Sequence, residues 1–113
     1  MAIPLQLRTL IDRLNQELAQ SEQEASEGLN RVRELLPQFP ENAQMTQFFA
    51  YFSTVLAFVG NSKRRIQVVL QKLATDEASA EEIQEAGEDL STLLGQVLET
   101  KIEVRKIITR LRS

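Results

Sequence analysis

Residues 43–62 read AQMTQFFAYFSTVLAFVGNS, and the basic run KRR follows at residues 63–65. From Asn42 through Ser62 there is no charged side chain, so the stretch fits either a membrane span or the centre of a helical core. At 100° per residue, its large apolar side chains cover about half of the helix circumference, and small or amide side chains cover the rest. Because lipid surrounds a membrane span on every side, the sequence predicts an amphipathic helix and argues against a membrane partner.

Two breaks divide the chain into three helical segments. The first is LLPQFPEN at residues 35–42, where Pro37 ends one helix and Pro40 suits the first turn of the next. The second is ATDEASAEE, in which Ser79 and Glu82 have the spacing of a capping box. Apolar residues recur at helical spacing between the breaks, and no stretch alternates with the period of a strand. The sequence therefore predicts helices over residues 4–36, 41–74 and 79–112.

Short connections make consecutive long helices antiparallel. The sequence predicts an all-α fold, an up-down-up bundle of three long antiparallel helices with coiled-coil-like packing, formed by a single domain over residues 1–113. The wide apolar face of the second helix predicts that this helix is central. Gly60 and Gly95 fall at one level, which indicates either a close crossing of the second and third helices or only a weakening of each. A domain-swapped arrangement through the turn at residues 37–41 is a further alternative.

The composition excludes several classes of chemistry. The 113 residues include no Cys and no His, which removes thiol nucleophiles, thiolate or imidazole metal ligands and the usual proton shuttle. Carboxylates, lysines and Tyr51 remain as acid–base candidates. A carboxylate metal site and a functional lysine are the sharper alternatives, but no cofactor motif accompanies either. We therefore expect no enzyme activity, no catalytic residue, no cofactor and no bound metal.

Charge gives little support for a nucleic-acid partner. The formal net charge is −3 and the pI is about 5.0, so the chain lacks a global positive field. The third helix begins with acidic and ends with basic residues, which matches the helix macrodipole. Lys63 and Lys101 border the apolar seams, where each can pair with a glutamate. The first residues lack the basic segment and apolar run of a signal peptide, so we expect a cytoplasmic protein.

Two sets of residues are candidate sites. The polar side of the second helix is small and uncharged, so it can pack against a second copy of the chain or against a different protein. Small residues of the first helix fall at the level of phenylalanines on the second, and they would line an apolar pocket if the rings failed to fill the gap. The candidate interaction face is Ala50, Ser53, Thr54 and Ala57, and the candidate apolar pocket is Ser21, Ala25, Gly28, Phe49 and Phe52.

These observations predict a non-enzymatic helical module for protein–protein interaction or oligomerisation. Its expected partner is another protein, or a second copy in a homodimer, because a thin bundle buries a limited fraction of its surface. The alternative is a bundle that binds a small molecule or a lipid in an apolar pocket between the first and second helices.

Overall fold

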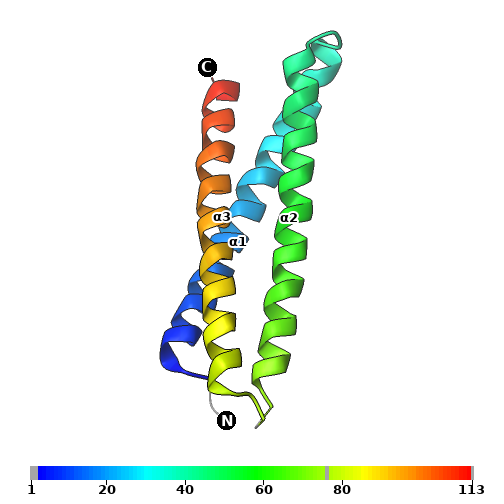
Figure 1. The fold of residues 1–113 in the computed structure, drawn as a ribbon. Coiled ribbons are helices and arrows are strands. Elements are labelled where there is room, and N and C mark those ends of the chain that lie inside the picture. The colour runs from blue at the N-terminus through cyan, green and yellow to red at the C-terminus, as the bar shows by residue number, and fades with distance from the viewer. Residues whose placement is uncertain (1–2, 76, 113) are drawn as a thin grey trace.

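The computed structural model describes residues 3–75 and 77–112. It consists of α1 (Leu5–Leu35), α2 (Ala43–Leu73) and α3 (Ala80–Arg112), with the short 3-10 helix η1 (Leu36–Gln38) after α1. The helices run along one another as an up-down-up rod with Cα extents of 57 × 19 × 16 Å (Figure 1). The predicted all-α three-helix bundle is confirmed. Each long helix begins and ends within two residues of its predicted bounds.

An asparagine sets the start of α2. Asn42 Oδ1 accepts hydrogen bonds from the backbone N–H groups of Gln44, at 3.0 Å, and Met45, at 3.2 Å. These bonds satisfy N–H groups that have no partner within the helix, so α2 begins at Ala43. The expectation that Pro40 lies in the first turn of this helix is therefore wrong.

The predicted capping box starts α3. The backbone N–H of Glu82 donates to Ser79 Oγ at 3.1 Å, and the N–H of Ser79 donates to the Glu82 carboxylate at 3.4 Å. Each side chain thereby satisfies a backbone donor of the other residue. The carboxylate of Glu82, together with that of Glu81, also lies near the positive end of the helix dipole.

The central helix is α1. It packs along both other helices, whereas α2 and α3 contact each other much less, and Figure 1 shows α1 crossing behind the other two. The prediction that the second helix is central is therefore wrong. The apolar arc of α2 packs mainly on α1. Phe52, for example, is completely buried with its ring against Gly28 of α1.

Buried apolar side chains form one column along the rod, and α1, α2 and α3 all contribute to it. Each large side chain that leaves water contributes about 1.5–3 kcal/mol to folding. The largest fully buried apolar side chains are those of Leu14, Leu18, Val32, Phe52, Val59, Ile66, Leu90, Leu93, Val97 and Val104.

Gly60 and Gly95 do not mark a close helix crossing. A Cβ placed on either glycine would have no heavy atom of a neighbouring described residue within 4 Å. Of the two alternatives for these glycines, the close crossing of the second and third helices is therefore wrong, in keeping with the few contacts between α2 and α3. Gly28 is the tight position instead, since a Cβ there would lie 2.4 Å from Phe52 Cζ.

Two serines are buried in the core and differ in their hydrogen bonds. Ser62 Oγ donates to the carbonyl of Phe58 at 2.8 Å. Ser21 Oγ is buried without a hydrogen-bond partner among the described residues. A buried hydroxyl without a partner loses its bonds to water and gains nothing in return, so Ser21 is a weak point of the core.

We expect Ser21→Ala to raise the free energy of unfolding by about 1 kcal/mol, because the change removes an unpaired hydroxyl and introduces a better helix former. Urea unfolding followed by circular dichroism measures the change. Ser62→Ala is the matched control, and because it deletes a bonded hydroxyl we expect no such gain. Equal effects of the two substitutions would contradict this account of Ser21.

Candidate interaction surfaces

The candidate interaction face lies on the outer side of α2. Ala50, Thr54 and Ala57 are exposed, and Ser53 is half-buried, so the structure places the four residues together and away from the core. The Thr54 hydroxyl donates to the Ala50 carbonyl at 2.9 Å. Because that hydroxyl is satisfied within α2, the face offers mainly methyl groups and backbone to a neighbour.

The uncharged surface ends at the exposed basic residues 63–65, and α2 carries one further exposed apolar side chain beyond them. Val68 lies eighteen residues after Ala50, which corresponds to five full turns, so both residues lie on the same line of the helix. The Val68 side chain is 62% exposed. The exposed sides of α1 and α3 carry more charged residues, although residues 90–98 of α3 also carry none. Residues 43–62 of α2 therefore lie in the longest stretch of the sequence without a charged side chain.

The candidate pocket residues come together between α1 and α2, and one of them fills the space. The Phe52 ring occupies the room that Gly28 leaves, because a Cβ on this glycine would lie 2.4–2.7 Å from three carbons of the ring. The Phe49 ring lies under the Arg33 guanidinium, whose carbon is 5.8 Å from the ring centroid. The buried members of the set are Ser21, Ala25, Gly28 and Phe52.

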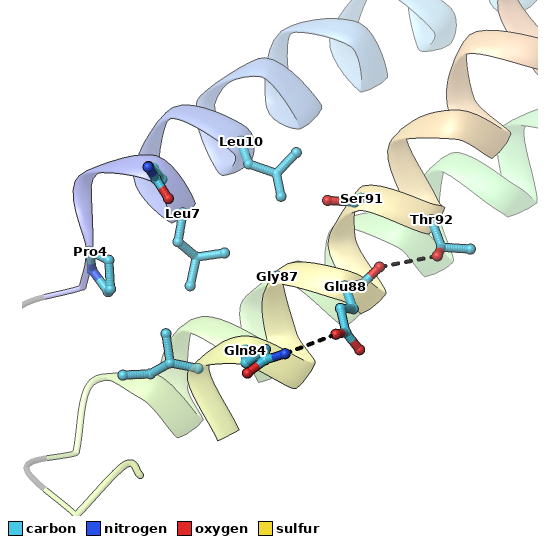
Figure 2. A pocket seen from close by; sticks show the side chains of 10 residues that line it. Pro4, Leu7, Leu10, Gln84, Gly87, Glu88, Ser91 and Thr92 are labelled. Atoms are coloured by element: carbon cyan, nitrogen blue, oxygen red, sulfur yellow. Dashed lines mark hydrogen bonds between the residues drawn. The ribbon is translucent and has the colours of Figure 1, made fainter. Parts of the chain in front are cut away.

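A cleft of about 760 Å³ opens between the start of α1 and the first half of α3. Figure 2 shows Leu7 and Leu10 pointing from α1 toward the α3 turns that carry Gly87 and Ser91. A Cβ on Gly87 would have no heavy atom of a neighbouring described residue within 4 Å. Reasoning from the sequence missed this cleft. Its only signal is the recurrence of small residues every four positions at Gly87, Ser91 and Gly95.

Both seam lysines form the ion pairs that the sequence predicted. Lys101 Nζ lies 3.0 Å from the Glu17 carboxylate, in a largely buried position, and Lys63 pairs with Glu22. The first pair joins α3 to α1 and the second joins α2 to α1. These contacts give both lysines a structural role, in which the aliphatic stems pack and the ammonium groups meet a carboxylate.

The described residues offer little acid–base or metal chemistry. Burial raises the pKa of Tyr51 above its usual value, and the nearby Glu103 carboxylate raises it further. The phenol is therefore protonated at neutral pH and is not poised as a general base. Within residues 3–75 and 77–112, no group of three or more Asp, Glu, His or Cys side chains could hold a metal ion.

In the part of the chain that the structure describes, none of the helices combines the length and the hydropathy that a transmembrane span requires. No match to this chain is found among models of protein families, curated proteins or solved structures. The assignment of function therefore depends on the outer face of α2, the cleft beside α3 and the groups that surround them.

Proposed function

We propose that this protein is a non-enzymatic interaction module, and that the outer face of α2 binds an apolar face of a helix in a protein partner. One observation carries the proposal: residues 43–62 present an exposed surface without a charged side chain, on a helix whose opposite side supplies core residues. Protein interfaces are depleted of charged residues at their centres, because each buried charge would have to be desolvated.

The size of the side chains supports the same proposal. Ala50, Ser53 and Ala57 allow a second helix to approach closely, and packed helix axes come within about 8–10 Å depending on the residues at the contact. A face evolved only for contact with water carries no such restriction on size. The non-enzymatic character and the cytoplasmic setting remain parts of this proposal, in keeping with the structural use of Lys63 and Lys101 in ion pairs.

Negative charges introduced on this face test the proposal. A photoreactive amino acid at Ser53, in cells that make the protein, is expected to cross-link one protein species. We expect Ala50→Glu and Ala57→Glu to lower that yield by about tenfold or more, because each leaves a carboxylate inside an apolar contact. Circular dichroism is expected to show unchanged helicity.

Ala19→Glu is the matched control, because Ala19 is an exposed alanine on α1 outside the proposed surface. It is expected to leave the cross-linking yield unchanged. Equal yields from the wild type and the two α2 variants, or the absence of any discrete cross-linked species, would overturn the proposed role of this face.

A further inference from the structure

The outer side of α3 carries an exposed apolar side chain and, closer to its N-terminus, a set of four residues with the spacing of a knob-receiving hole. Ile102 is 57% exposed, an exposure similar to that of Val68 on α2. Four other residues of α3, spaced i, i+3, i+4 and i+7, surround one part of the cleft in Figure 2. Such a set is the hole that receives a knob from a facing helix. Its members are Gln84, Gly87, Glu88 and Ser91.

The positions of knob and hole are symmetric about a glycine. Gly95 lies seven residues after Glu88 and seven residues before Ile102. Seven residues make nearly two helical turns, so all three positions fall on one side of α3. Two α3 helices laid antiparallel with both Gly95 residues at the crossing would place each Ile102 over the hole of the other copy.

The glycines themselves favour this crossing. A Cβ atom added to Gly87 or to Gly95 would have no heavy atom of a neighbouring described residue within 4 Å. Packing inside the bundle therefore does not require a glycine at either position. Glycine weakens a helix relative to alanine. A second helix on this face would explain both glycines. The absence of a side chain at Gly95 would let the two helix backbones approach, and the absence of one at Gly87 would make room for the Ile102 side chain of the other copy.

Charge selects the antiparallel orientation. In a parallel pair like charges would face each other, whereas in an antiparallel pair each acidic half of α3 faces a basic half. With the crossing at Gly95, Lys106 falls about one turn from Glu88 of the second copy, which the long side chains can span. The acidic half contains Glu81, Glu82, Glu85, Glu88 and Asp89, and the basic half contains Lys101, Arg105, Lys106, Arg110 and Arg112. Lys101 and Arg105 pair with α1 and Asp89 pairs with α2 inside the bundle, so the attraction between copies comes from the other members.

We propose that a second copy of this chain occupies this face, and that two α3 helices pair antiparallel around a two-fold axis at Gly95. The inference goes beyond the proposed function, because it uses a surface separate from the outer face of α2. In the resulting dimer Ile102 of each copy fills the Gly87 hole of the other, and both α2 faces stay available for a different protein.

Light scattering and sedimentation over a range of concentrations test the dimer. We expect the wild-type chain to be dimeric, and Ile102→Asp and Gly87→Leu to raise the dissociation constant by about a hundredfold, because one places a carboxylate in the hole and the other fills it. Leucine is a better helix former than glycine, and circular dichroism of Gly87→Leu is expected to show unchanged helicity, which separates loss of the dimer from unfolding. Val68→Asp is the matched control, because Val68 is similarly exposed on α2, and it is expected to remain dimeric.

A charge exchange and a cross-link test the orientation. We expect Lys106→Glu to weaken the dimer about three- to tenfold, and Glu88→Lys added to it to restore the affinity. The sequence contains no cysteine, so Gly95→Cys provides a single thiol per chain. Two such thiols at the two-fold axis are expected to form an intermolecular disulfide on mild oxidation, because their Cα atoms come within about 7 Å. Ala57→Cys is expected not to do so.

The outcomes separate this inference from the proposed function. A monomeric wild-type chain, or a dimer that Ile102→Asp and Gly87→Leu leave unchanged, would overturn the α3 pairing. A dimer that dissociates only in Ala50→Glu and Ala57→Glu would also overturn it and would assign self-association to α2. An intact α3 dimer whose α2 face cross-links no protein would overturn the proposed function alone.

Discussion

Gly28→Ala is expected to lower the free energy of unfolding by about 1–3 kcal/mol, although alanine is the better helix former. A Cβ at this position would lie 2.4 Å from Phe52 Cζ and 2.7 Å from both Cε atoms of the same ring. These distances are far inside van der Waals contact. The ring is completely buried, so it has no open space to enter, and the clash must instead push α1 and α2 apart.

Gly60→Ala is the matched control for this substitution. Gly60 is also in the interior of a long helix, but a Cβ there would meet no heavy atom of a neighbouring described residue within 4 Å. We therefore expect a gain of about 1 kcal/mol from helix propensity alone. Urea unfolding of both variants provides the comparison, and a gain in Gly28→Ala equal to that in Gly60→Ala would show that the close contact costs nothing.

A second substitution identifies which contact causes the loss of stability in Gly28→Ala. Phe52→Leu removes the far end of the side chain, so combining it with Gly28→Ala is expected to relieve the clash. The double variant should then be more stable than the sum of the two single changes predicts, with a coupling energy of about 1 kcal/mol or more. Additive effects would place the cost of Gly28→Ala somewhere other than the Phe52 ring.

The bounds of the helices could be predicted from the sequence because their signals are local. Ser79 and Glu82 interact within one turn, and the apolar spacing along each helix depends on that helix alone. The antiparallel order follows from the short turns. The start of α2 was misplaced because two local signals compete there, and the side chain of Asn42, which caps the helix, outweighs the preference of Pro40 for a first turn.

The arrangement of the helices around the axis could not be predicted in the same way. Periodicity identifies the apolar side of each helix but not the angle at which two axes meet, which depends on the sizes of the side chains in contact. Gly28 and Gly60 both lie within helical patterns in the sequence, yet only Gly28 meets a ring. For the same reason the sequence did not identify α1 as the helix on which the other two converge.

Of the candidate surfaces, likewise, one could be predicted from the sequence and one could not. The small, uncharged side of α2 could be predicted as exposed, because it lies opposite the apolar arc of a single helix. The cleft beside Gly87 could not, because it forms where α1 and α3 separate. The charge polarity of α3 has a sufficient explanation in the macrodipole. The proposed α3 pairing depends in addition on the exposed position of Ile102.

Phe52→Ala is expected to lower the free energy of unfolding by about 3–5 kcal/mol. The loss should lie toward the upper end, because Gly28 and Ala25 on the facing helix have no long side chains that could move into the vacated space, and a cavity remains. Phe39→Ala is the matched control. Phe39 is 51% exposed in the turn after η1, so we expect its removal to cost about 1 kcal/mol or less.

The cavity in Phe52→Ala also tests the alternative of an apolar ligand between α1 and α2. An apolar cavity of this kind binds benzene, and a ligand that binds only the folded state raises the Tm. We expect benzene to raise the Tm of Phe52→Ala by several degrees while leaving that of the wild type unchanged, because the Phe52 ring already occupies the site. An equal rise in the wild type would mean that this level of the bundle accepts an apolar molecule beside the ring, and would favour ligand binding over a purely structural use of Gly28.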